Sequence, residues 1–226
     1  MKSSNLFLKK VFSCAEQGIP VRSVLDDAQI RRLVLDKNAE VRNLMAEALV
    51  FDQPDAFITE QLCLLARDAD ALVRTNALDS LGSFVSEESF QLLIDSLSES
   101  DSLARMYAVL SVVDVGKILN PRQTRDLLMQ LEETEQDGLV LNAIYRGQYI
   151  LGQKDTLELM MAQYAEGDYY VRCSVLRSLA EIFSAENSDK IKAFAESVDP
   201  NESVAVRDAF LELKAQMTRS TPRKDQ

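Results

Sequence analysis

The side chains that most often carry out catalysis are missing or scattered in this sequence. It contains no histidine, which removes Ser-His-Asp and Cys-His catalysis together with the commonest metal ligand. Adjacent carboxylates at Glu87-Glu88 and Glu132-Glu133 have the chemistry of an acid–base pair, but they lie in polar turns or on helix faces, where solvation explains them. No phosphate-binding glycine motif occurs. We therefore expect a protein that is not an enzyme and needs no cofactor and no metal.

The three cysteines, Cys14, Cys63 and Cys173, are far apart, and each lies in an apolar helical pattern. This placement predicts buried free thiols in a reducing compartment. Lys9 and Lys10 interrupt the apolar run that a signal peptide would need, and no apolar run approaches the roughly 18 residues of a membrane span. We expect a cytoplasmic protein that does not enter a membrane.

The formal net charge is −11. Nucleic-acid binding depends on Lys and Arg that neutralise phosphate, so an acidic chain disfavours it. An acidic surface instead attracts proteins with a basic surface.

Tyrosines are concentrated in one region. Of six, five lie between residues 145 and 170: Tyr145, Tyr149, Tyr164, Tyr169 and Tyr170. Tyrosine suits protein interfaces because it combines a large rigid ring with a polar tip. We predict a binding patch around Tyr169, Tyr170 and Arg177, with Tyr145 and Arg146 nearby. The alternative is that Tyr145 or Tyr149 fills the core.

A Val-Arg or Ala-Arg pair recurs along the chain. Its arginines are separated by 32, 31, 67 and 35 residues, and the gap of 67 holds one further unit, Glu135 to Gly152, that lacks the arginine. The arginines are Arg42, Arg74, Arg105, Arg172 and Arg207. Six units of this length indicate a helical solenoid.

Each unit divides into two amphipathic helices joined by an acidic turn, in which residues such as Asp70 can cap the second helix. We expect one repeat domain over residues 1–217, with capping helices in 1–35, repeats in 36–217 and a flexible tail at 218–226. The expected later hairpins pair 90–97 with 103–115, 124–131 with 139–151, 157–164 with 171–183, and 191–198 with 204–213.

The units resemble HEAT repeats. They share the acidic turn, the Val-Arg pair, and the small or apolar residues three and seven positions after the arginine. In the second unit these residues are Ala77 and Leu81. The resemblance implies an all-α, right-handed α-α superhelix of about six helical-hairpin repeats. It also implies that the arginines pair with turn acids, for which the candidates are Asp36, Asp68, Asp70, Glu99, Asp101, Asp168 and Asp199.

In HEAT-like solenoids the second helices line the concave binding face. Positions two and six after each Val or Ala of the recurring pair are Asn43/Glu47, Thr75/Asp79, Met106/Leu110, Cys173/Arg177 and Asp208/Glu212. This register predicts acidic binding positions at Glu47, Asp79, Asp208 and Glu212. The alternative is a solvated helix face at the ends and inter-unit packing in the middle.

Three functions follow as hypotheses. The first is a non-enzymatic scaffold or adaptor that binds a partner protein on the concave face. The second is an immunity or inhibitor protein that blocks a basic, nucleic-acid-processing enzyme. The third is a HEAT-like DNA glycosylase or other HEAT-like enzyme, but the chain lacks the tryptophans and the basic charge of those DNA-binding clefts.

Overall fold

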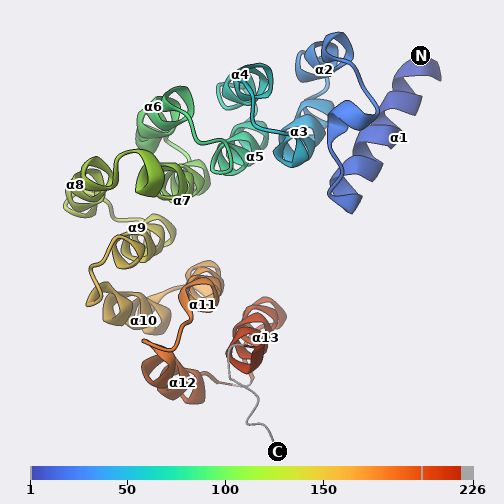
Figure 1. Ribbon diagram of the computed structural model, residues 1–226. Helices are drawn as coiled ribbons and strands as arrows, with labels where there is room; N and C mark the ends of the chain where they lie inside the picture. The colour runs from blue at the N-terminus through green and yellow to red at the C-terminus, as the bar shows by residue number, and fades with distance from the viewer. Residues whose placement is uncertain (1, 200, 220–226) are drawn as a thin grey trace, which may run out of the picture. The chain divides into compact units, whose positions relative to one another are not determined.

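The computed structural model describes residues 2–199 and 201–219, which form thirteen α-helices and no strand (Figure 1). The all-α, HEAT-like solenoid class predicted from the repeats is confirmed. The helices are α1 Lys2–Gln17, α2 Asp27–Val34, α3 Ala39–Ala48, α4 Ala56–Leu65, α5 Ala71–Leu81, α6 Glu87–Asp95, α7 Ser102–Leu119, α8 Pro121–Glu132, α9 Gly138–Ile150, α10 Thr156–Glu166, α11 Tyr169–Ile182, α12 Ser188–Glu196 and α13 Val204–Arg219.

By its internal contacts the chain divides into two compact units, Met1–Thr124 and Arg125–Gln226. The boundary falls inside α8. A single domain over residues 1–217 stays a prediction. A flexible tail was predicted for residues 218–226, but α13 continues to Arg219. Residues 220–226 lie outside the described residues.

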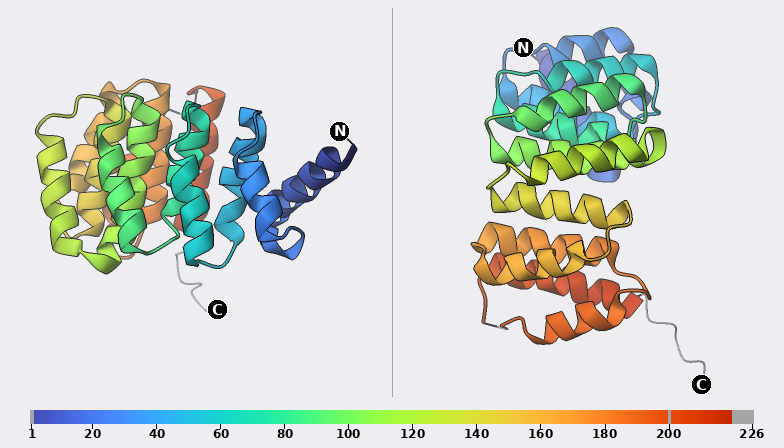
Figure 2. Two further views of the ribbon diagram at one scale, coloured as in Figure 1. Left: turned by 90° about the horizontal axis from the view of Figure 1, so that it is seen from above. Right: turned by 90° about the vertical axis from the view of Figure 1, so that its left-hand side faces the viewer.

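The first unit consists of stacked helical hairpins. Helices α3, α5 and α7 pack side by side in one layer, while α2, α4 and α6 form the other, and α1 packs against α3 (Figure 2). Helix α2 was predicted together with α1 as a cap. It packs on α3 and α4 and forms a hairpin with α3, and its role as a cap stays a prediction.

Short polar residues begin most of these helices, as the acidic turns predict. The Asp70 carboxylate accepts hydrogen bonds from the backbone N–H groups of Leu72 and Val73, at 3.0 and 3.2 Å. Such a cap satisfies donors that have no partner within the helix. The other residues that cap a helix in this way are Asp26, Asn38, Asp55, Ser86, Asp101, Asp137 and Asp168.

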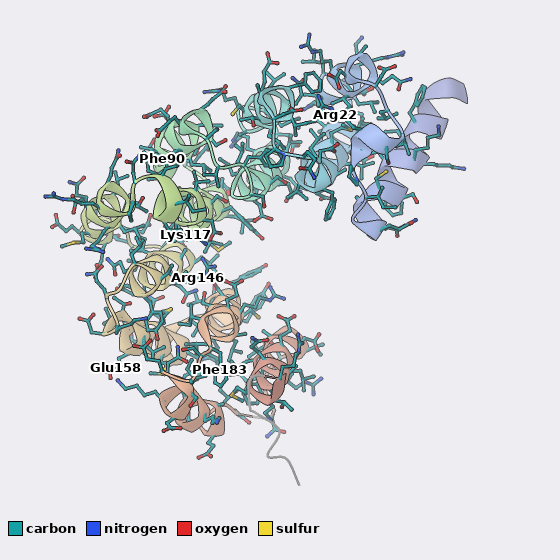
Figure 3. The ribbon with its side chains drawn as sticks, in the orientation of Figure 1. Arg22, Phe90, Lys117, Arg146, Glu158 and Phe183 are labelled. Carbon is teal, nitrogen blue, oxygen red and sulfur yellow. The ribbon has the colours of Figure 1, made fainter. Side chains whose placement is uncertain are left out.

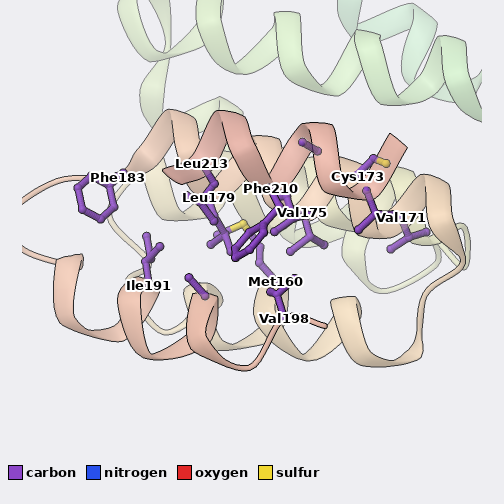
Figure 4. Packing of buried hydrophobic residues seen from close by; sticks show 14 of the residues in the cluster. Met160, Val171, Cys173, Val175, Leu179, Phe183, Ile191, Val198, Phe210 and Leu213 are labelled. Atoms are coloured by element: carbon purple, nitrogen blue, oxygen red, sulfur yellow. The ribbon is translucent and has the colours of Figure 1, made fainter. Parts of the chain in front are cut away.

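The second unit repeats the arrangement, with α9, α11 and α13 in one layer. Its core is a continuous apolar cluster in which Leu179, Ile191 and Leu213 are fully buried (Figure 4). Tyr149 belongs to this core, and its hydroxyl accepts a hydrogen bond from Asn187 Nδ2 at 2.9 Å. The alternative that Tyr149 fills the core of the unit without the arginine is therefore confirmed.

All three cysteines are buried and free, as predicted. Burial raises the pKa of the Cys63 thiol to about 11, with a smaller contribution from the nearby Glu88 carboxylate. A thiol in such surroundings stays protonated near neutral pH and is a poor nucleophile. None of the described helices has the length and apolar character that crossing a bilayer requires.

Candidate protein-interaction surface

The recurring arginines join consecutive hairpins. Arg42 on α3 donates from Nε and Nη2 to the two carboxylate oxygens of Asp68, at 2.6 and 2.7 Å, and from Nη1 to the backbone carbonyl of Asp36 at 2.7 Å. Asp68 belongs to the turn of the next hairpin, whereas Asp36 belongs to the turn of its own. These hydrogen bonds lower the pKa of Asp68 and raise that of Arg42. One side chain thus connects two turns.

Arg74 forms the same joint one hairpin later. Its Nη1 donates to the carbonyl of Asp68 at 2.9 Å, and its Nε lies 3.2 Å from a carboxylate oxygen of Glu99. Arg105 donates to the carbonyl of Glu99 at 2.8 Å, and Arg172 donates to Glu202 at 2.6 Å. A repeated contact of this kind is what stacking of solenoid units requires.

Only part of the predicted acid set pairs with an arginine side chain. Asp68 and Glu99 do, and Asp36 contributes its backbone carbonyl. The candidates Asp70, Asp101 and Asp168 instead cap helices. Asp199 accepts hydrogen bonds from Asn201, and Glu202, which was not among the candidates, pairs with Arg172. Arg207 is exposed and has no ion-pair partner within the described part of the chain.

The residues that do not repeat include an exposed tyrosine pair at the start of α11. Tyr169 and Tyr170 are 46% and 57% exposed, and their ring centroids lie 3.8 Å apart with an interplanar angle of 33°. Hydrogen bonding with the Tyr170 side chain is the main cause that raises the pKa of Tyr169, to about 12, so the Tyr169 phenol stays neutral at physiological pH. The Asp168 cap holds the helix end that carries them. Both large side chains are thus open to a partner.

Arg177 completes this surface. It lies seven residues after Tyr170, which is two helical turns, so both residues lie on one side of α11. Its guanidinium is exposed and lies 3.3 Å from the carboxylate of Glu212 on α13. We name Tyr169, Tyr170 and Arg177 the tyrosine surface; three of the predicted site residues form it, and a fourth, Glu212, lies beside it.

Tyr145 and Arg146, also predicted as binding residues, are largely withdrawn from solvent. Tyr145 packs against the core cluster of the second unit, and burial raises its pKa. The Arg146 side chain on α9 is only 11% exposed, and its Nε lies 2.6 Å from a carboxylate oxygen of Glu181 (Figure 3). The structure therefore gives these residues packing and inter-helix contacts, and their contact with a partner stays a prediction.

Two of the predicted acidic positions lie in the first unit and two in the second. In the first unit, Glu47 and Asp79 line a pocket of about 270 Å³ with Phe51 and Asn76. Asn76 Nδ2 donates to Glu47 at 2.8 Å and to Asn43 at 2.7 Å, which links α5 to α3. In the second unit, Asp208 and Glu212 are exposed on α13.

Several positions of the predicted binding register are buried in helix packing. Thr75, Met106 and Cys173, each two residues after the recurring Val or Ala, are buried. Burial at these three positions agrees with the packing alternative, whereas Leu110 is half-buried and Arg177 is exposed. Sequence reasoning missed the polar contacts that accompany this packing: Ser80 Oγ donates to the carbonyl of Ala46 at 2.7 Å, and Asn142 Nδ2 donates to Ser174 and Ser178. The sequence did carry a signal for these contacts. A serine recurs six positions after the recurring arginine in α5, α7 and α11, as Ser80, Ser111 and Ser178.

No three His, Cys, Asp or Glu side chains converge on a possible metal position in the regions that the structure describes. No curated protein matches the sequence. Residues 59–147 match a family model described as HEAT repeats, and this segment runs from within α4 into α9. The HEAT-repeat resemblance predicted from the recurring arginines is therefore confirmed over residues 59–147.

Proposed function

We propose that this protein is a non-enzymatic scaffold that binds a partner protein through the tyrosine surface. HEAT repeats generally serve as protein-interaction scaffolds. The observation that carries the proposal is the exposed pair of Tyr169 and Tyr170, whose rings contact each other, on the same helix as the exposed Arg177. Tyr and Arg are the residue types that most often dominate the binding energy of protein interfaces.

The tyrosine surface also has little freedom to lose on binding. Its two rings contact each other and sit on a helix whose first turn Asp168 caps. Immobilising a flexible side chain at an interface costs roughly 0.5–1.5 kcal/mol, and a side chain that is already ordered avoids much of this cost. Rigid aromatic residues of this kind serve as anchors.

The charges near the tyrosine surface favour a partner with a basic face. Asp208 and Glu212 are exposed on α13, and Arg177 is already paired with Glu212. In a chain of net charge −11, exposed carboxylates accelerate encounter with basic proteins and repel acidic ones. The buried free thiols fit a reducing compartment, so we place this interaction in the cytoplasm.

A second candidate function rests on the acidic pocket of the first unit. Glu47 and Asp79 line it together with the exposed Phe51, a combination that suits a long basic side chain. An inhibitor of a basic, nucleic-acid-processing enzyme would use such carboxylates in place of phosphate. It would form a tight one-to-one complex, whereas a scaffold binds through the tyrosine surface and can take several partners.

The test is affinity capture from the source organism with quantitative mass spectrometry. The double variant Tyr169→Ala/Tyr170→Ala is compared with wild type and with Leu72→Ala, a matched control because Leu72 is an exposed residue at the equivalent start of α5. We expect wild type and Leu72→Ala to recover the same partner and the double variant to lose it.

Equal recovery by all three proteins would refute the assignment of the tyrosine surface. Loss of the partner only on Glu47→Gln/Asp79→Asn would favour the inhibitor function, and light scattering of the purified complex would then give its stoichiometry.

A further inference from the structure

The second unit has an open apolar groove between α12 and α13. None of the residues that line it belongs to the tyrosine surface, which lies on α11. The groove has a volume of about 470 Å³. Ala195 and Val198 of α12, with Phe210 and Met217 of α13, form its apolar floor, and Figure 4 shows Val198 and Phe210 within the core cluster that lies beneath. Lys192 and Glu196 lie on the α12 side, and Lys214 lies on the α13 side.

Lys214 departs from the pattern of the other hairpins. It lies seven residues after Arg207, at the position where Leu49, Leu81 and Leu179 follow their own arginines, and all three are completely buried. Lys214 is exposed instead, and its ammonium lies 4.3 Å from the centre of the Phe210 ring. The position that carries a core side chain in the earlier hairpins therefore carries a positive charge in the last one.

The two lysines of the groove also differ from the others around them. Lys190 on α12 pairs with Glu158, and Lys154 pairs with Glu186. Neither Lys192 nor Lys214 forms an ion pair with any residue in the described parts of the chain. The two ammonium groups outnumber the single carboxylate of Glu196 in the groove. An apolar floor with this excess of positive charge is complementary to apolar side chains flanked by carboxylates.

We propose that this groove binds an amphipathic helix of a partner protein, with apolar side chains on the floor and carboxylates facing Lys192 and Lys214. A helix fits because α6 already packs in this way on both helices of the hairpin α4/α5. A partner helix would make the analogous contacts with α12 and α13. This second docking site is separate from the tyrosine surface and selects a partner of opposite charge.

The test uses two synthetic helical peptides of about 16 residues, long enough for roughly four turns. Both carry leucine at helical spacing; one has glutamate on both flanks, and the other has lysine at the same positions. Binding to the full chain is measured by fluorescence anisotropy, and hydrogen exchange locates the bound peptide. We expect the glutamate-flanked peptide to bind at least about 5-fold more tightly than the lysine-flanked one. The glutamates gain exposed ion pairs with Lys192 and Lys214, whereas the lysines are repelled, and each such interaction changes the affinity by a small factor.

The variant Lys192→Glu/Lys214→Glu should reverse this preference. Two controls should retain it: Lys9→Glu/Lys10→Glu, which makes the same change of charge on exposed lysines of α1, and Tyr169→Ala/Tyr170→Ala, which removes the tyrosine surface. Circular dichroism confirms that each variant keeps its helices. Because the tyrosine variant retains peptide binding, failure of one proposal is distinguishable from failure of the other.

Four results would overturn the proposal. If neither peptide binds, Lys214 is a polar end cap only, as terminal solenoid repeats require for solubility. If the preference survives the charge reversal, or if exchange protection lies outside α12 and α13, the groove is not the site. A dimer without peptide that Lys214→Glu dissociates would assign the groove to a second copy of this chain.

Discussion

Removal of the Arg42 side chain tests whether the arginine joints stabilise the fold. Arg42→Ala removes two charge-assisted hydrogen bonds to Asp68 and one to the carbonyl of Asp36. The two side chains are only 16% and 11% exposed, so the remaining Asp68 carboxylate stays poorly solvated. A hydrogen bond to a charged group contributes about 1.5–3 kcal/mol, and a buried group left without a partner adds a desolvation penalty.

We therefore expect Arg42→Ala to lower the free energy of unfolding by about 2–4 kcal/mol, which is between the values for exposed and fully buried ion pairs. The matched control is Arg207→Ala, the same substitution at an exposed arginine of the last hairpin, for which we expect at most about 0.5 kcal/mol. Urea unfolding followed by circular dichroism measures both, because the chain has no tryptophan for fluorescence. The Arg42→Ala midpoint should fall by roughly 1 M.

A double-mutant cycle with Asp68→Asn separates the pair from the other contacts of each residue. We expect a coupling free energy of about 1–2 kcal/mol. The reasoning is refuted if Arg42→Ala costs no more than Arg207→Ala, or if the two substitutions are additive within about 0.5 kcal/mol.

Three further predictions concern pH, thiol reactivity and packing. Because Arg42 lowers the pKa of Asp68 below its ordinary value of 3.8, the stability from this pair is fully present above that value and is lost as the pH falls through the lowered pKa; urea midpoints of wild type should fall more steeply in acid than those of Asp68→Asn. With its thiol pKa at about 11, Cys63 should react with a disulfide reagent roughly 100-fold more slowly in the native than in the urea-unfolded Cys14→Ser/Cys173→Ser variant; equal rates would contradict its burial. Gly116→Ala would place a methyl group against Thr124 Oγ1 and within 2.7 Å of the Phe90 ring, and should destabilise the protein by about 1–3 kcal/mol; Thr124→Ala should recover part of this loss in thermal unfolding, and an unchanged melting temperature for Gly116→Ala would argue against the close packing.

The sequence predicted the hairpins well because each one repeats the same physical requirement. A turn acid that caps a helix, followed by a Val-Arg pair, places equivalent residues in equivalent surroundings, and the expected second helix over 171–183 corresponds to α11 at Tyr169–Ile182. Asp68 and Glu99 were predicted as arginine partners for the same reason. The buried thiols followed from their apolar neighbours alone.

Predictions for single positions depended on contacts between distant residues and were less accurate. Arg146 looked like a surface residue, but Glu181, 35 residues away, lies beside it in the fold. Glu202 replaces Asp199 as the partner of Arg172 because the local course of the turn decides which acid reaches the guanidinium. Tyr169 and Tyr170 were predicted to belong to a binding patch, and both are exposed at the start of α11.

The arginine joints described here have a direction. Arg42 and Arg74 each take a carbonyl from the turn before them and a carboxylate from the turn after them. An insertion or deletion of one whole hairpin between such turns would therefore bring a matching donor and acceptor together again. An insertion or deletion of only a few residues would move an arginine out of reach of its carboxylate and leave both without a partner. The joints thus make the number of hairpins easier to change by duplication than the length of any one of them.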